Sequence, residues 1–182
     1  MAVHPEWAEF SVGSPSTASN WTNPDCQPLT HIYHVTHLAA AHEVFAKGAL
    51  RAGLIFDKSK LNTHRILVNW LSPNSWAYGY RYGNVRFVFS WPDLIEGLRF
   101  YWVEAMAYGI TAPRILATAN NHDGLLQPYD PTSGDGPWWY DQENQQHYWN
   151  GEYTLEVMVE RDIELQACEK IDFVRHHAKS TQ

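Results

Sequence analysis

Cysteine is scarce in this sequence of 182 residues, because only Cys26 and Cys168 are present and they lie far apart. Two isolated cysteines offer no disulfide framework, which fits a reducing compartment. They also lack the paired spacing of a structural zinc site, and no HExxH sequence is present. The sequence therefore favours neither a disulfide-stabilised fold nor a cysteine-ligated metal.

Long hydrophobic runs and a basic leader are absent as well. No apolar stretch reaches the roughly 20 residues that a membrane-spanning helix needs. The first ten residues, MAVHPEWAEF, contain neither the basic region nor the apolar region of a secretion signal. We therefore expect a cytoplasmic protein that has no membrane partner.

Basic residues are few: 13 Lys and Arg stand against 20 Asp and Glu, for a formal net charge of −7. This balance argues against broad, non-specific nucleic-acid binding, which depends on cationic side chains. It still permits a local basic groove, for which Arg65, Arg81 and Arg86 are the candidates.

Aromatic residues are abundant instead, with nine Trp and ten Tyr in a chain whose length suits a single domain. Such rings either line a ligand pocket or form a large aromatic core. Residues 11–28 are rich in Ser, Thr, Asn and Pro, which predicts an N-terminal arm or loop over residues 1–28. One domain would then occupy residues 29–182.

The stretch HIYHVTH at residues 31–37 carries three histidines, and its β-branched and aromatic residues predict a strand. Because strand side chains alternate, His34 and Thr36 face one way while His31 and His37 face the other. Three histidines on two faces cannot share one metal ion. We therefore assign no metal site to this stretch.

Hydrophobic periodicity predicts the other elements. A helix is expected from about residue 38 to Gly48, with Thr36 or His37 as its cap, and a second helix is expected over residues 91–109. Further strands are expected over residues 66–71, 84–89 and 153–159, and a long irregular loop over residues 118–152. This order of elements predicts a mixed α+β domain.

The predicted loop is rich in large rings, namely Trp138, Trp139, His147, Tyr148 and Trp149. A loop of this length in a compact domain is usually functional, so these rings could close over a ligand. The alternative is an ordinary disordered insertion.

The strand YTLEVMV at residues 153–159 places Glu156 between apolar residues. Leu155, Val157 and Val159 share one face of this strand, and Glu156 lies on the other. A carboxylate in an apolar strand is costly unless it is paired or functional. Glu156 is therefore either a catalytic residue or a salt-bridged structural one.

Two stretches resemble a known family. The first is Tyr33-His34-Val35-Thr36-His37, followed by a predicted helix and by AKGALRAG at residues 46–53. The second is Glu156-Val157-Met158-Val159 with its continuation ERDIELQACEKIDFV at residues 160–174. Together they resemble the opening and the end of ADP-ribosyltransferases, and in particular of the DarT-type toxins that modify DNA bases.

The resemblance implies an ADP-ribosyltransferase-like fold, which is a split mixed β-sheet core with flanking helices, in one catalytic domain over residues 29–182. It implies a toxin or defence effector that uses NAD as co-substrate, modifies a DNA or RNA base, and is restrained by an antitoxin protein. Thr154 stands two residues before Glu156, so the sequence has no Glu-x-Glu pair. This speaks against the arginine-modifying branch of the superfamily.

The resemblance also implies roles for individual residues. Glu156 would be catalytic, because it could stabilise an oxocarbenium-like transition state and bind the ribose 2′-OH. His34 would bond the ribose of the adenosine half of NAD, and Thr36 would help to place it. The remaining cofactor-binding candidates are Arg65 or Arg81 at the pyrophosphate and Tyr80 and Tyr82 around the nicotinamide. The candidates for binding the acceptor are Trp138, Trp139, His147 and Tyr148.

Other functions remain open alternatives. An NAD glycohydrolase would use water as the acceptor on the same fold, and other transferases would modify a protein or a small molecule. A non-catalytic, aromatic-rich module would bind a nucleotide or sugar, and Glu156 would then be structural. A metal hydrolase would combine histidines of residues 31–37 with His64 or His122.

Overall fold

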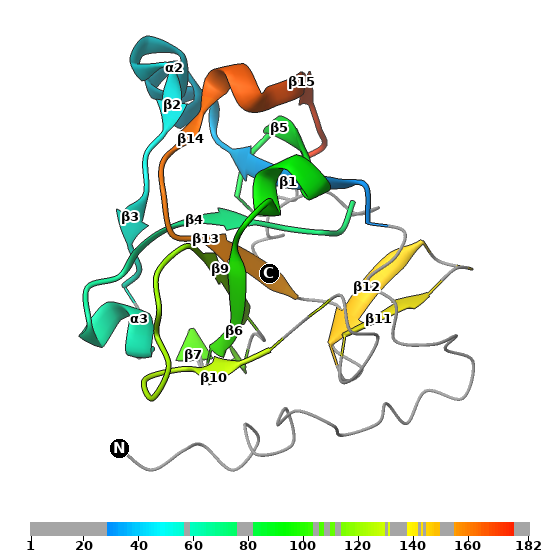
Figure 1. The fold of residues 1–182 in the computed structure, drawn as a ribbon. Helices are drawn as coiled ribbons and strands as arrows, with labels where there is room; N and C mark the ends of the chain where they lie inside the picture. The colour runs from blue at the N-terminus through cyan, green and yellow to red at the C-terminus, as the bar shows by residue number, and fades with distance from the viewer. Residues whose placement is uncertain are drawn as a thin grey trace.

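The computed structural model describes residues 29–56, 59–75, 82–103, 106–107, 110–111, 114–129, 131, 138–141, 143, 145–149 and 155–176. The predicted arm at residues 1–28 lies outside the described residues. Within the described part, strands dominate and helices are few (Figure 1). This confirms the predicted α+β class.

Two sheets form the framework of the domain (Figure 1). The smaller sheet is antiparallel with the order β1-β5-β15, and its strands are β1 (His31–Thr36), β5 (Val85–Ser90) and β15 (Cys168–Phe173). The larger sheet has the order β10-β6-β9-β13-β4-β3. Its strands are β10 (Gln127–Pro128), β6 (Arg99–Val103), β9 (Arg114–Thr118), β13 (Glu156–Val159), β4 (Leu67–Leu71) and β3 (Gly53–Leu54).

The larger sheet is mixed, because β9 and β13 run parallel while its other described pairs are antiparallel. The predicted strands at residues 31–36, 66–71, 84–89 and 153–159 correspond to β1, β4, β5 and β13. Three short pairs complete the described strands: β2 (Ala49–Leu50) with β14 (Ile163–Glu164), β7 (Met106–Ala107) with β8 (Ile110–Thr111), and β11 (Trp138–Asp141) with β12 (Gln146–Trp149).

The helical elements are short: α2 (Leu38–Lys47), α3 (Lys60–Thr63), α4 (Trp91–Ile95) and the 3-10 turn η1 (Leu165–Ala167). The first predicted helix is confirmed as α2. His37 is its N-cap residue, although the His37 side chain makes no capping hydrogen bond. Gly48 ends the helix with a φ of 68°, which a glycine adopts without the steric cost of a side chain.

The predicted helix over residues 91–109 is wrong. Helix α4 ends at Ile95, and strand β6 begins only four residues later at Arg99. Gly97, with a φ of 71°, turns the chain between them. The following run RFYWV pairs in full with β9, from Arg99 opposite Thr118 to Val103 opposite Arg114. The aromatic residues of this run satisfy a strand better than a helix once β9 is available as a partner.

The expectation of an irregular loop over residues 118–152 is also wrong, because β11 and β12 form an antiparallel hairpin within it. Asn74 anchors this hairpin through its side-chain amide. Its Nδ2 donates to the carbonyl of His147 at 2.8 Å, and its Oδ1 accepts from the His147 backbone N–H at 2.6 Å. The Trp138 ring lies 6.0 Å from the Trp91 ring, centroid to centroid, within the main core. The hairpin is therefore packed onto the domain.

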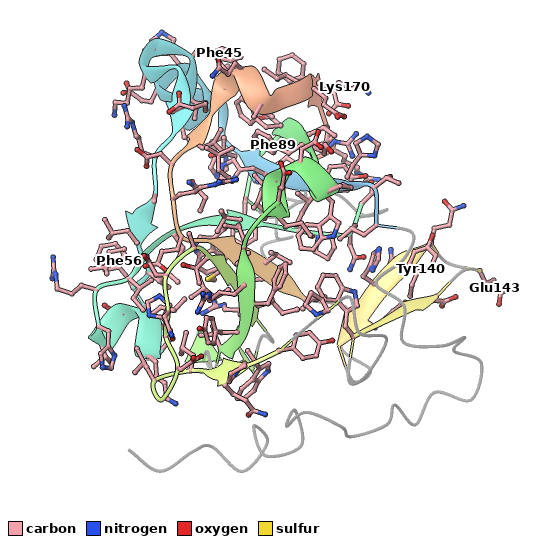
Figure 2. All side chains as sticks on the ribbon, viewed as in Figure 1. Phe45, Phe56, Phe89, Tyr140, Glu143 and Lys170 are labelled. Atoms are coloured by element: carbon pink, nitrogen blue, oxygen red, sulfur yellow. The ribbon has the colours of Figure 1, made fainter. Side chains whose placement is uncertain are left out.

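Alternating side chains of the larger sheet form two separate apolar clusters. Val157 and Val159 of β13 belong to the main core, which also contains Phe87 and Phe89 of the smaller sheet. Met158 faces the opposite way, into the second cluster, as the predicted alternation requires. Figure 2 shows Phe89 within the main core, while Phe45 and Phe56 lie at the surface.

His147 provides a test of the hairpin packing by pH. Its side chain is buried, and the Trp138 Nε1–H donates to its Nδ1 at 2.9 Å, so the ring is neutral with its proton on Nε2. Burial lowers the pKa of His147 from 6.5 to about 4. The unfolded chain therefore binds a proton at this residue below pH 6.5, and the folded chain does not until about pH 4.

The contribution of neutral His147 to the free energy of unfolding is thus fully present above pH 6.5, and it declines as the pH falls toward 4. We expect the free energy of unfolding to drop by roughly 3 kcal/mol over this range from this residue. Urea unfolding at several pH values measures the drop, and His147→Gln should reduce it. An unchanged pH dependence in that variant would contradict the assigned protonation state.

Candidate functional site

The two sheets meet at the end of β4. Tyr33 of β1 and Ser72, the residue after β4, exchange two backbone hydrogen bonds of 3.0 and 2.8 Å. Strand β13 begins at Glu156 and pairs with the same end of β4, with Val157 opposite Leu71. Glu156 therefore lies at the junction of the two sheets, close to β1.

Glu156 is paired with a buried arginine. On the parallel strands β13 and β9, Glu156 lies opposite Arg114. The Arg114 Nε donates to Glu156 Oε2 at 2.7 Å. The Arg114 side chain is 1% exposed and that of Glu156 is 16% exposed, so the carboxylate lies between the buried guanidinium and the surface. Such charge-assisted bonds are the stronger kind of protein hydrogen bond.

Two aromatic residues enclose this pair. The Arg114 guanidinium carbon lies 4.5 Å from the centroid of the Trp70 ring, a cation–π contact. The Tyr82 hydroxyl donates to Glu156 Oε1 at 3.3 Å. The Trp70 and Tyr82 rings meet edge to face, with centroids 6.4 Å apart. Both carboxylate oxygens of Glu156 thus have a defined hydrogen-bond partner.

His34 completes this group of residues through Trp70. Its Nδ1 lies 2.8 Å from the Trp70 carbonyl oxygen, which can only accept, so Nδ1 carries the proton. Burial lowers the pKa of His34, which favours the neutral ring. The neutral ring then presents Nε2 as a hydrogen-bond acceptor. We refer to His34, Trp70, Tyr82, Arg114 and Glu156 as the Glu156 cluster.

Gly83 sets the position of Tyr82. Its φ is 146°, and a Cβ added there would lie 2.1 Å from the Thr36 carbonyl carbon and 2.4 Å from the His37 nitrogen. The chain after Tyr82 therefore packs directly on the backbone at the end of β1. Thr36, a predicted cofactor-binding residue, lies at this contact.

Of the residues that the sequence singled out separately, the structure joins Tyr82 and Glu156 directly, and it connects His34 to them through the carbonyl of Trp70, whose ring lies beside that of Tyr82. Arg65 is not among them, because it lies in the turn before β4 with a φ of 54°. Val157 lies opposite Leu71, six residues after Arg65, so at about 3.3 Å per strand residue Arg65 and Glu156 lie on the order of 20 Å apart. Tyr80 and Arg81 lie outside the described residues.

The predicted acceptor-binding residues have other surroundings. Trp138 and His147 are buried and contact each other, so neither ring is accessible for stacking on a base. This corrects their expected role, because both are needed to pack the hairpin. Trp139 pairs with Tyr148 in the hairpin ladder, and the side chain of Trp139 lies outside the described residues. Burial and the nearby Asp141 raise the pKa of Tyr148.

Sequence reasoning missed Arg114 and Trp70. Arg114 opens the run RILAT, all of which is buried, so the argument used for Glu156 applies to it equally. A charged residue at the edge of an apolar strand is the signal that could have identified it. Trp70 carried no comparable signal among nine tryptophans.

Arg86, a candidate for a basic groove, is engaged by a carboxylate. Its Nε and Nη2 donate to the two oxygens of Asp172, each at 2.9 Å, and its guanidinium lies over the Tyr33 ring. The Arg86 guanidinium holds the pKa of Asp172 down at about 2. The charge of Arg86 is thus compensated within the smaller sheet.

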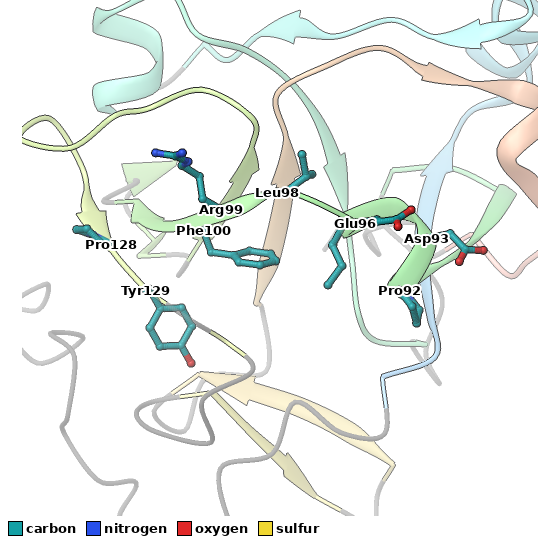
Figure 3. Close-up of a pocket in the computed structure, with 9 residues that line it drawn as sticks. Pro92, Asp93, Glu96, Leu98, Arg99, Phe100, Pro128 and Tyr129 are labelled. Atoms are coloured by element: carbon teal, nitrogen blue, oxygen red, sulfur yellow. The ribbon is translucent and has the colours of Figure 1, made fainter.

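An open cavity of about 900 Å³ lies elsewhere, between α4, β6 and β10 (Figure 3). Phe100, Pro128 and Tyr129 line it, together with the charged side chains of Asp93 and Arg99. None of the predicted site residues lines this cavity. We therefore place the candidate site at the Glu156 cluster, where the chemically active groups converge.

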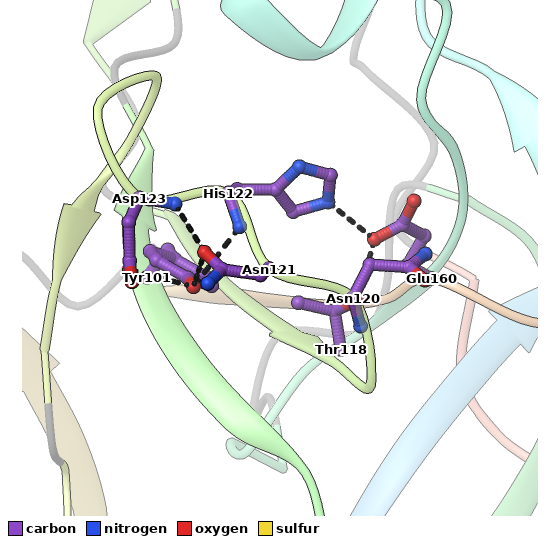
Figure 4. A network of polar contacts seen from close by, with 7 residues as sticks. All are labelled: Tyr101, Thr118, Asn120, Asn121, His122, Asp123 and Glu160. Atoms are coloured by element: carbon purple, nitrogen blue, oxygen red, sulfur yellow. Dashed lines mark hydrogen bonds and ion pairs between the residues drawn. The ribbon is translucent and has the colours of Figure 1, made fainter.

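A second polar network lies at the opposite end of β13 (Figure 4). Glu160 Oε2 accepts from the Thr118 hydroxyl and contacts His122 Nε2 at 2.7 Å. The Tyr101 hydroxyl accepts from the His122 backbone N–H at 3.0 Å and donates to Asp123 Oδ1 at 3.0 Å. These contacts hold the chain that follows β9. Among the described residues, no group of three His, Cys, Asp or Glu is arranged to hold a metal ion.

Glu160→Gln should therefore affect stability. The amide cannot accept as strongly from both Thr118 and His122, so we expect a loss of about 1–2 kcal/mol in the free energy of unfolding. Urea denaturation followed by tryptophan fluorescence measures it. A variant as stable as the wild type would show that the network contributes nothing to folding.

This chain matches no protein-family model, and neither a curated protein nor a solved structure matches it. Among the described residues, no helix has both the length and the apolar character needed to cross a membrane. The chemistry of the Glu156 cluster is therefore the basis from which a function can be inferred.

Proposed function

We propose that this protein is an NAD-dependent ADP-ribosyltransferase whose catalytic residue is Glu156. The observation that carries the proposal is the contact of Tyr82 with Glu156 at the sheet junction where His34 bonds the carbonyl of the neighbouring Trp70. His34, Tyr82 and Glu156 come from three separate segments, and the two resembling motifs predicted a common site for two of them. A mixed β-sheet core with few helices is compatible with the fold that this activity implies.

ADP-ribosyl transfer from NAD could use an oriented carboxylate, such as that of Glu156, beside an exposed aromatic ring, such as that of Tyr82. Transfer breaks the bond between the nicotinamide nitrogen and ribose C1′, and positive charge develops on the ribose. The Glu156 carboxylate would stabilise that charge and accept a hydrogen bond from the ribose 2′-OH. Tyr82 is 58% exposed, so its ring can stack on the nicotinamide. The neutral Nε2 of His34 would accept from a ribose hydroxyl of the adenosine half.

The proposed acceptor is a base of DNA or RNA, as in the toxins that the sequence resembles. A cytoplasmic toxin of this kind would need an antitoxin protein to restrain it. After Trp138 and His147 are set aside, Tyr148 and Trp139 remain as proposed acceptor contacts. Arg81 likewise remains proposed for the pyrophosphate.

An NAD glycohydrolase is the second candidate. The net charge of −7 and the pairing of Arg86 with Asp172 favour an acceptor that needs no basic groove, which water satisfies. The Glu156 cluster would perform the same bond cleavage, and water would attack C1′.

Incubation with NAD labelled in its adenosine half tests both candidates. Purified protein is incubated with single-stranded DNA, RNA, cell lysate or buffer alone, and both acceptor label and free nicotinamide are measured. Label on nucleic acid supports the transferase, and nicotinamide release in buffer alone supports the glycohydrolase. A folded protein that neither releases nicotinamide nor transfers label would refute the proposal and favour a non-catalytic binding module.

A further inference from the structure

We infer that Arg114 is a positioning residue, which orients the Glu156 carboxylate for reaction without touching NAD. This inference deepens the proposed function and rests on it. Arg114 is fully buried, so it cannot reach the pyrophosphate of a bound dinucleotide. Its role therefore differs from that expected of Arg65 or Arg81.

The environment of Arg114 fixes the direction of its hydrogen bond. The guanidinium is planar, and its contact with the Trp70 ring at 4.5 Å restrains that plane. The parallel pairing of β9 with β13 places Glu156 directly opposite Arg114. The bond from Nε to Oε2, at 2.7 Å, then restrains the orientation of the Glu156 carboxylate.

This arrangement gives the two carboxylate oxygens different roles. Oε2 is engaged by the buried guanidinium, whereas Oε1 points toward Tyr82, whose side chain is exposed. Oε1 is therefore the oxygen that meets the ribose 2′-OH and the developing positive charge. An unrestrained carboxylate would sample other orientations, which would reduce turnover more than NAD binding.

Arg114→Lys and Arg114→Met test the inference. Nicotinamide release gives kcat and KM for NAD, and titration calorimetry with ADP-ribose gives a binding constant that does not depend on catalysis. For Arg114→Met we expect kcat to fall about 100-fold, while KM and the ADP-ribose Kd change by less than about threefold. The kcat of Arg114→Lys should be about tenfold higher than that of Arg114→Met, because an ammonium group can still bond Oε2. It should remain below that of the wild type, because an ammonium group has no plane to stack on the Trp70 ring.

Arg51→Met is the matched control, since Arg51 forms an ion pair with Asp162 at the surface, outside the Glu156 cluster. Its kcat should equal that of the wild type. If Arg114→Met does not fold, a tenfold lower kcat with unchanged ADP-ribose Kd in Arg114→Lys carries the same conclusion. Circular dichroism and thermal melting establish which variants are folded.

Two results overturn the inference while leaving the proposed function intact. In the first, the wild type is active and either Arg114→Lys or folded Arg114→Met has the same kcat as the wild type. In the second, an Arg114 variant has a raised KM for NAD and a raised Kd for ADP-ribose at unchanged kcat, which would make Arg114 a binding residue. A wild type that neither binds ADP-ribose nor cleaves NAD overturns the proposed function and this role together.

Discussion

Replacement of Glu156 by Gln is expected to lower the rate of nicotinamide release from NAD by at least about 100-fold. The amide has nearly the shape of the carboxylate, but it carries no charge to stabilise an oxocarbenium-like transition state. Its oxygen can still accept from Arg114 Nε, which in the native protein donates to Glu156 Oε2 at 2.7 Å. The buried guanidinium thus keeps a hydrogen-bond partner, although it loses its counter-charge.

Because loss of that counter-charge can destabilise the fold, Glu156→Asp is measured alongside. Aspartate keeps the negative charge near Arg114 but withdraws the carboxylate by one methylene. We expect Glu156→Asp to fold and to release nicotinamide more slowly than the wild type. Rates are determined from nicotinamide release, and folding from circular dichroism and melting temperature.

Glu160→Gln is the matched control for Glu156, since both residues lie on the same face of β13 and its continuation, four positions apart. Glu160 contacts Thr118 and His122, and it has no described contact with the Glu156 cluster. The control should lose stability but keep activity. Wild-type turnover in folded Glu156→Asp and Glu156→Gln would remove Glu156 from the mechanism and leave it as a structural partner of Arg114.

Replacement of Gly83 by Ala is expected to lower the free energy of unfolding by more than about 3 kcal/mol. The new Cβ would fall 2.1 Å from the Thr36 carbonyl carbon and 2.2 Å from its oxygen. These are backbone atoms of β1, so no side-chain rotation relieves the overlap. The φ of 146° is in addition a conformation that an alanine rarely adopts.

Loss of activity should accompany this loss of stability. Moving the chain at position 83 displaces Tyr82, whose hydroxyl bonds Glu156 Oε1. Urea denaturation measures the stability, and nicotinamide release measures the activity of whatever fraction is folded.

Gly97→Ala separates backbone strain from steric overlap. Gly97 also has a positive φ, of 71°, but an added Cβ there would meet no atom within 4 Å. We expect this variant to lose only about 1 kcal/mol and to retain activity. Equal effects of the two substitutions would mean that Gly83 does not pack against the end of β1 as described.

Much of the local structure could be predicted because it follows from local patterns. The β-branched residues at 31–36 formed β1, and Gly48 ended α2 where expected. The helix predicted over residues 91–109 failed for a physical reason. The aromatic residues in RFYWV are compatible with the periodicity of a helix and with that of a strand. Because β9 is available as a hydrogen-bonding partner, the segment forms a strand.

The candidate site was predictable only in part. Glu156 could be identified because a carboxylate inside an apolar strand is costly unless it has a purpose. Its contacts with Arg114 and Tyr82 could not be read from the sequence, since these residues are 42 and 74 positions away. Trp138 was equally prominent in the sequence, yet the hairpin places its ring in the core.

The sequence by itself determined which face of each strand is apolar, and therefore that Glu156 points away from Val157 and the main core. It also determined where β1, β4, β5 and β13 form. Only the tertiary structure decided that β9 lies beside β13 and that Ser72 joins β4 to β1. The reason is that alternation reports which side of a strand is buried, whereas sheet order and register determine which distant side chains meet there.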